Sequence, residues 1–258
     1  MRSDYETMRE IINGFSDPDG RPTSDGLAAW RARRPLKLAV PHMLDPQADE
    51  PYPYDLRTTF ARRSSTTDYA PEPLDAEPLL ASVQAALVED AGAWEDDATP
   101  PDPPDPPDGT AAAEAAGATA VHLEPFVVLL RSRGAPPGVY RIRTNGTDLV
   151  ANPPDPEQIE GMTVQKEFAR AGAIVSVAAN LDEADAWAGA HGYRHAMARA
   201  AAVIYSVHLR SAARGLTGTV FAGLSPSAVR HLLDSDGVGR HQMFAATVAV
   251  PPSVVPPS

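Results

Sequence analysis

The residues with the clearest potential for chemistry are two adjacent arginines followed by hydroxyl side chains. Arg62 and Arg63 precede four such residues, from Ser64 to Thr67. Guanidinium and hydroxyl groups placed together can hold a phosphate by charge-assisted hydrogen bonds. Much later in the chain, the turn Gly215 to Gly218 could cradle an anion with its backbone N–H groups. Both patterns also occur on ordinary protein surfaces, so neither identifies a site by itself.

Groups that could transfer a proton are few. The chain has only two lysines, Lys37 and Lys166, and it has no cysteine, which excludes disulfides, thiolate nucleophiles and zinc–thiolate sites. His191, His195 and His208 lie in or beside one long segment rich in apolar residues. A histidine on a mostly apolar helix is usually packed and hydrogen-bonded. Lys166, His191 and His195 are therefore the candidates for catalysis, and no metal site is expected.

Charge and hydropathy restrict the class of protein. The 258 residues carry a formal net charge of −12, which argues against a nucleic-acid partner held through its phosphates. The same charge would suit a basic peptide. No stretch approaches 18 consecutive apolar residues, and the N-terminal residues are charged with no apolar run behind them. We expect a cytoplasmic protein that does not enter a membrane.

One long helix is expected to position most of these groups. Residues 193–214 contain neither Gly nor Pro, and apolar residues recur at helical spacing from Met197 to Val207. Gly215 follows at the position expected of a C-terminal cap. The many alanines allow other backbones to approach closely, so a core helix is predicted.

The rest of the chain predicts strands alternating with helices. Continuous apolar runs and an Asn145-Gly146 turn indicate strands. We predict an α+β domain with a mixed sheet over residues 56–250, preceded by an N-terminal extension (1–55) and followed by a disordered tail (251–258). The expected strands are 125–130, 139–142, 173–179 and 243–250, and the expected shorter helices are 77–90, 164–171 and 225–233.

An acidic, proline-rich stretch interrupts this domain. Residues 89–109 hold eight acidic residues, no basic residue and three Pro-Pro pairs. Such a segment cannot bury enough apolar surface to order itself. We predict a disordered insertion at residues 89–110, which could serve as a lid, as an arm for a partner, or simply as a variable surface loop.

Four segments, in this order along the chain, resemble the nitroreductase superfamily in its azoline dehydrogenase branch of the SagB type. Arg63 to Tyr69 is similar to the RRSxRx[FY] element of that branch. Ala116 to Val128 is similar to PSAGATHPLExYVVV, and Pro137 to Ile142 matches PGVYRY. Gly192 to Leu216 resembles the segment that opens with GYRY and ends in AALGLG.

The resemblance implies a nitroreductase-like fold, in which helices wrap a mixed sheet and the long helix lies at a two-fold dimer interface. It implies FMN bound at that interface by residues of both chains. It also implies oxidation of thiazoline and oxazoline rings in ribosomally made peptides. The cofactor contacts carried over to this sequence are Arg63, Ser65, Thr67, Gly117, Gly215 and Gly218.

This sequence departs from the pattern where chemistry is expected. Ser64 and Thr67 stand where the branch has arginines, and Ala115-Ala116 replaces a Pro-Ser pair. A Lys-Tyr pair usually precedes GYRY, but Trp187 and Ala188 occupy those positions. Aromatising an azoline needs a group that takes a proton while hydride moves to the flavin. Neither replacement can do so.

Three hypotheses follow. The chain is itself an FMN-dependent oxidoreductase acting on azoline rings or related peptide bonds. Alternatively, it is a catalytically reduced subunit that pairs with an intact homologue and helps recruit the peptide precursor. A free-standing nitro or enone reductase fits less well, because the PGVYR hairpin belongs to the peptide-modifying branch. The coincident losses favour the second hypothesis, and both a homodimer and a heterodimer with a related dehydrogenase subunit are compatible with it.

Overall fold

The computed structural model describes residue 36 and residues 38–44, 51–94, 121–188 and 190–253. Its centre is a seven-stranded sheet with the order β1-β6-β5-β3-β7-β9-β8, in which every neighbouring pair of strands is antiparallel. A separate parallel pair joins β2 to β4. The strands are β1 (Val40–His42), β2 (Leu74–Asp75), β3 (Leu123–Leu129), β4 (Ser132–Arg133), β5 (Gly138–Arg143), β6 (Gly146–Ala151), β7 (Ala173–Ala179), β8 (Val220–Phe221) and β9 (His241–Val248).

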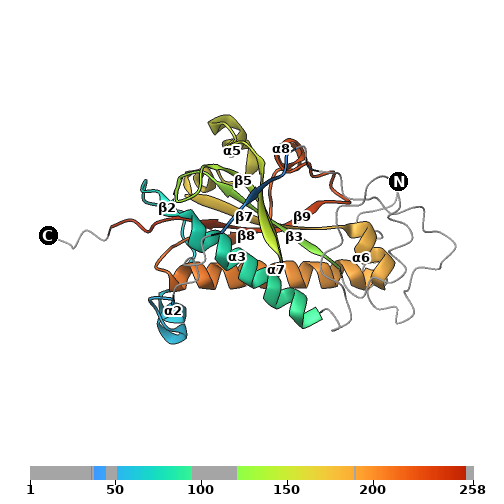
Figure 1. Ribbon diagram of the computed structural model, residues 1–258, viewed down its shortest axis with the longest axis horizontal. Helices are drawn as coiled ribbons and strands as arrows, with labels where there is room; N and C mark the ends of the chain where they lie inside the picture. The colour runs from blue at the N-terminus through green and yellow to red at the C-terminus, as the bar shows by residue number, and fades with distance from the viewer. Residues whose placement is uncertain (1–35, 37, 45–50, 95–120, 189, 254–258) are drawn as a thin grey trace, which may run out of the picture.

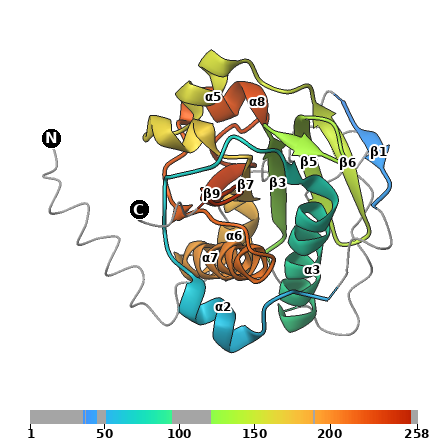
Figure 2. The ribbon, with the colours of Figure 1, turned by 90° about the vertical axis from the view of Figure 1, so that its left-hand side faces the viewer.

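Helices cover both faces of the sheet. In Figures 1 and 2 the long helix α7 runs beneath the sheet with α3 and α2 beside it, while α5 and α8 lie on the opposite face. The arrangement confirms the predicted α+β class, and the parallel pairing expected of a mixed sheet is confined, in the described residues, to β2 and β4 and the short bridge between Ser65 and Gly218. The helices are α2 (Leu56–Arg62), α3 (Ala76–Trp94), α5 (Pro156–Met162), the 3₁₀ helix η3 (Lys166–Arg170), α6 (Leu181–Ala188), α7 (Ala190–Ala213) and α8 (Pro226–Leu232).

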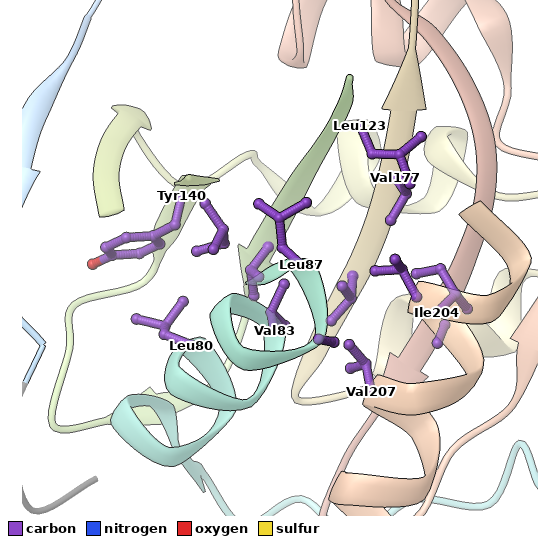
Figure 3. Packing of buried hydrophobic residues seen from close by; sticks show 14 of the residues in the cluster. Leu80, Val83, Leu87, Leu123, Tyr140, Val177, Ile204 and Val207 are labelled. Atoms are coloured by element: carbon purple, nitrogen blue, oxygen red, sulfur yellow. The ribbon is translucent and has the colours of Figure 1, made fainter. Parts of the chain in front are cut away.

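The two central strands explain why the sequence shows continuous apolar runs there. Every residue of β3 and β7 is buried, because helices cover both of their faces. On one face the strands pack against α3 and α7, as Figure 3 shows for Val83, Val177 and Ile204. On the other face a second apolar cluster includes Phe126, Ile174 and residues of α8. The core therefore has two layers with the sheet between them.

The long helix forms as predicted, with its first residue three positions earlier. It ends in a Schellman cap, in which Leu216 donates its N–H to the Ser211 carbonyl at 2.9 Å and Gly215 donates to Ala212 at 3.0 Å. Gly215 has φ +80°, a left-handed conformation that favours glycine. The cap fixes where the chain leaves α7 for the Gly218 turn.

Two predicted boundaries are wrong. The first six residues of the predicted disordered insertion, 89–94, complete α3, because Asp90 forms an ion pair with buried Arg199 and Glu89 pairs with Arg210. The N-terminal extension is also not wholly outside the domain. Its residues 40–42 form β1 and pair with β6.

The other parts of these segments, including 1–35, 95–120 and 254–258, lie outside the described residues. Within the part that is described, no helix is long and apolar enough to cross a membrane.

Candidate functional site

The predicted phosphate-binding residues from the two ends of the domain meet beside the C-terminal half of α7. Ser65 forms a parallel bridge with Gly218, and Thr66 donates its N–H to the Gly218 carbonyl at 3.2 Å. A Cβ on Gly218 would lie 1.9 Å from the Thr247 carbonyl oxygen, so no larger residue fits there without a shift of the backbone. Ser65 and Gly218, two predicted contacts that are far apart in the sequence, thus lie side by side.

A cationic side chain and two buried polar atoms lie at the same corner. Arg63 follows the last turn of α2, and among the described residues its guanidinium has no acidic partner. His208 of α7 is buried, and the pKa of its imidazole is lowered by burial and then by the charge of Arg63. The His208 Nε2 and the Ser211 Oγ are buried without a hydrogen-bond partner in the described structure. These features fit a bound anion, because a phosphate would supply the missing acceptor oxygens.

The other predicted cofactor contacts lie differently. Thr67 is exposed on the segment that follows Ser65. Gly215 serves the cap of α7, with Tyr54 packed against it. Gly117 lies outside the described residues.

A pocket of about 660 Å³ opens at the other end of the long helix. It combines aromatic and basic side chains with an apolar floor, and none of the described residues that line it is acidic. From His195 to His208, the rise of a helix gives about 20 Å between the pocket and the anion corner. The pocket is lined by Trp187, His191, Arg194, His195, Met197, Ala198, Ala201 and Phe244.

His195 is wedged between two indole rings in this pocket. The ring centroids of Trp94 and Trp187 each lie 4.5 Å from that of His195. Burial lowers the pKa of His195, and the charge of Arg199 one turn along lowers it further, while Asp90 opposes the shift. The imidazole is therefore held neutral, with its Nε2 buried and unpartnered in the described structure.

The pocket depends on a tight crossing of α6 and α7. A Cβ on Gly192 would lie 1.7 Å from the Ala184 carbonyl oxygen, so glycine allows the first turn of α7 to lie against α6. The Asn180 side chain accepts the N–H groups of Asp182 and Glu183 at 3.0 and 3.2 Å and starts α6. This local geometry places Trp187 over His195.

The three predicted catalytic candidates do not gather at one point. His191 and His195 line the pocket. Lys166 lies on η3 with 79% of its side chain exposed, and its ammonium is 3.8 Å from the Glu160 carboxylate. Among the described residues, no group of three His, Asp or Glu side chains could hold a metal ion.

Sequence reasoning missed a histidine–carboxylate pair near the pocket. The Nδ1 of His122, just before β3, lies 2.5 Å from Oε1 of Glu183 on the first turn of α6. Sixty-one residues separate the two side chains, so no local spacing in the sequence could have indicated the pair.

An apolar stripe on α7 continues from the pocket along the surface. Tyr193, Met197 and Tyr205 are exposed large side chains on this helix. The opposite side of α7, which includes Val203, Ile204 and Val207, is buried in the core. The resemblance predicted this helix for a dimer interface, and the exposed stripe is compatible with that prediction.

Solved structures give the comparison. The chain superimposes on a predicted nitroreductase from Anabaena variabilis with a TM-score of 0.58 and 18% identity, over 77% of this chain and 38% of that one. A second, from Ralstonia eutropha, gives a TM-score of 0.54 and 18% identity over 85% and 98% of the two chains. The chain has a nitroreductase-like fold.

A third similar structure is the E. coli microcin synthetase McbBCD complex with truncated pro-MccB17 bound. Its TM-score is 0.53 with 13% identity, and the alignment covers 97% of this nitroreductase-like chain and 95% of that one. No protein-family model matches the sequence, and no curated protein matches it. The likeness therefore establishes the fold, and activity has to be argued from the site.

Proposed function

We propose that this nitroreductase-like chain is an FMN-dependent oxidoreductase subunit that dehydrogenates azoline rings of a ribosomally made peptide. The observation that carries the proposal is the corner where Arg63, Ser65 and Gly218 meet beside the buried, unpartnered Nε2 of His208. Residues predicted for cofactor binding from opposite ends of the domain converge there. The similarity to a complex that holds a peptide substrate supports the choice of a peptide.

Within one chain, the cofactor phosphate and the substrate would bind at opposite ends of α7. Arg63 and the backbone around Ser65 would hold the phosphate of FMN. The flavin, when bound, supplies a two-electron hydride acceptor. The pocket at the other end would receive the peptide ring, because Trp187 and Phe244 offer flat apolar surfaces and Arg194 offers hydrogen-bond donors. Hydride transfer needs reacting atoms about 3–3.5 Å apart, and the pocket lies about 20 Å from this chain's own anion corner. The flavin beside the pocket would therefore be the one that the partner chain holds.

A second chain would complete the site. The exposed stripe of Tyr193, Met197 and Tyr205 adjoins the pocket, so a partner packed on α7 would cover the pocket and exclude water from it. Isologous two-fold contact is the commonest way for such a surface to be buried. We propose either a second copy of this chain or a related dehydrogenase subunit as the partner.

A second candidate function is a catalytically reduced subunit that supports an intact homologue. The observation that favours it is Trp187, which lies where the resemblance expects a lysine and packs on His195 instead of offering a proton-transfer group. Lys166 lies on the surface at η3, outside the pocket lining.

Flavin content tests the proposal. The purified chain should carry FMN with visible absorbance near ~450 nm, and Arg63→Gln should weaken FMN binding about 10- to 100-fold, because a hydrogen bond to a charged group is lost. Arg57→Gln is the matched control, since Arg57 is an exposed arginine of the same helix. Equal FMN affinity in both variants would refute the assignment of the anion corner.

Co-expression separates the two candidate functions. An active subunit binds FMN as a homodimer and oxidises the peptide alone. A reduced subunit acquires FMN and influences turnover only beside an intact homologue. Tyr205→Glu should shift either dimer toward monomer in size-exclusion chromatography, because it places a charge in the apolar stripe.

A further inference from the structure

Two buried polar side chains in the C-terminal half of α7 lack the hydrogen bonds that burial normally requires. His208 and Ser211 are each only 4% exposed, yet the Nε2 of His208 and the Oγ of Ser211 have no hydrogen-bond partner in the described structure. Buried polar groups are nearly always satisfied, and leaving one without a partner destabilises a fold. The two residues lie three positions apart, so they share one face of the helix. A single polar ligand could satisfy both.

Several contacts join this face of α7 to the anion corner of Arg63, Ser65 and Gly218. The Ser211 carbonyl accepts a backbone N–H at 2.9 Å in the cap that ends α7, and the chain reaches Gly218 two residues after that donor. Gly218 forms the bridge with Ser65, which follows Arg63 by two residues. From the other side, the charge of Arg63 acts on the imidazole of His208. The unpartnered atoms therefore belong to the anion corner.

The imidazole of His208 is kept neutral in the absence of a ligand. Burial lowers its pKa, and the positive charge of Arg63 lowers the pKa further. No carboxylate of the described residues pairs with its Nε2 to oppose this shift. A protonated His208 would place a second buried positive charge close to the first, which is unfavourable without an anion.

The other charged or titratable groups that α2, α3 and α7 bring to this half of the helix have partners of their own or face solvent. The strand β8 and the two residues of β9 that pair with it are apolar. The groups are Arg62 stacked over Tyr54, Arg214 stacked over Tyr52, Arg210 bound to Tyr52 and Glu89, and the exposed Asp55, Arg57 and Tyr205. Arg63 is thus the charge that acts on His208.

A phosphate monoester at Arg63 would change this balance. It carries a charge of about −1.5 to −2 at pH 7, which is more than one guanidinium neutralises, so a second cation beside it is stabilised. An imidazolium Nε2–H and a serine hydroxyl can each donate a hydrogen bond to a phosphate oxygen. A ligand with a single negative charge, such as a carboxylate, would be balanced by Arg63 alone.

We propose that His208 and Ser211 complete the phosphate site, and that His208 takes up a proton from solvent when a phosphate monoester binds, an inference that rests on the proposed function. The site then favours a ligand with a terminal phosphate, such as FMN, over riboflavin, which has none. His208 is a cofactor-binding residue, and binding of the cofactor is coupled to pH.

Calorimetric titration with FMN, repeated in buffers of different ionisation enthalpy, measures this proton. We expect the wild-type protein to take up roughly one proton per FMN near pH 7, and its affinity to rise by up to about tenfold per pH unit as the pH falls from about 8 to 6.5. His208→Gln should take up no proton and bind FMN about 10- to 100-fold more weakly, because a hydrogen bond to a charged group is lost. Its affinity for riboflavin should not change.

Two further variants bracket this result. Ser211→Ala should weaken FMN binding about 3- to 10-fold, because a neutral donor is lost, and should keep the proton uptake. His231→Gln is the matched control, since His231 is an exposed histidine of α8 on the opposite face of the sheet. Its FMN affinity should stay within about twofold of the wild type, with the same proton uptake.

Nitrogen NMR of the ¹⁵N-histidine-labelled wild-type protein gives a readout that does not depend on how well a variant folds. At pH 7, His208 should be neutral without FMN and an imidazolium with FMN bound. A neutral His208 in the FMN-loaded protein would overturn the inference, and so would an unchanged FMN affinity in His208→Gln; both results leave the proposed function standing. If the wild-type protein binds FMN no better than riboflavin, the proposed function fails, and the role of His208 fails with it.

Discussion

The buried ion pair between α3 and α7 offers the sharpest test of how the pocket end of the fold is held. Arg199 has 4% and Asp90 has 6% of its side chain exposed. The guanidinium of Arg199 donates to both Asp90 oxygens, at 2.6 and 3.2 Å, and also to the Val121 carbonyl. Asp90→Asn removes the negative charge while conserving the size and most of the shape of the side chain.

The expected loss is large because Arg199 cannot give up its charge. Removing one partner of a buried pair leaves an uncompensated ion and costs about 3–5 kcal/mol of unfolding free energy. For a domain of this size, that loss corresponds to a fall in Tm of roughly 6–20 °C. Arg199→Met combined with Asp90→Asn should recover part of the loss, since no charge then remains buried.

Urea unfolding followed by circular dichroism measures these free energies. Glu89→Gln is the matched control, because Glu89 pairs with Arg210 next to Asp90 but is 62% exposed, and an exposed pair is worth at most about 1 kcal/mol. If Asp90→Asn costs no more than Glu89→Gln, the pair is solvated and the account of this end of the fold is wrong.

Two further predictions concern helix packing and pH. Gly192→Ala should disrupt the α6–α7 crossing and strongly lower the stability of the fold. Gly161→Ala in α5 should be neutral or stabilising, because a Cβ there meets nothing within 4 Å. Thermal melts of both variants check this prediction. Burial lowers the pKa of His195 and His208, so the unfolded chain binds protons more readily than the folded one, and stability should fall as the pH drops below about 6.5. His195→Phe should show a shallower fall in urea titrations between about pH 7 and 5, and an equal slope would contradict the shift.

The sequence predicts the elements whose signal is periodic and local. The continuous apolar run at 173–179 is β7 with the predicted bounds. A hairpin joins β5 to β6 as predicted, but its turn is Thr144-Asn145, one residue earlier than expected, because Gly146 already pairs with Arg143. Residues 156–162, by contrast, follow a proline-rich loop and form α5. Its capping box, in which Asp155 and Gln158 bond each other's backbone N–H groups, was the signal that could have predicted it.

Long-range pairing explains what could not be predicted. The acidic composition of residues 89–94 indicates disorder, yet Asp90 is ordered by an arginine 109 residues away. The contact between His122 and Glu183 could not be predicted either, because 61 residues separate them. In contrast, the meeting of Ser65 with Gly218 was implied by a family resemblance, which carries tertiary information that composition and spacing do not.

The contacts of Arg199 also affect how well this chain tolerates a change in its length. Its guanidinium binds Asp90, four residues before the end of α3, and Val121, the first described residue after position 120. One side chain therefore fastens both ends of the stretch between them. Because the entropy of closing a loop grows only with the logarithm of its length, this junction can accept longer or shorter connections at little energetic cost. The length of chain between Asp90 and Val121 can thus change without disturbing α3 on one side or β3 on the other.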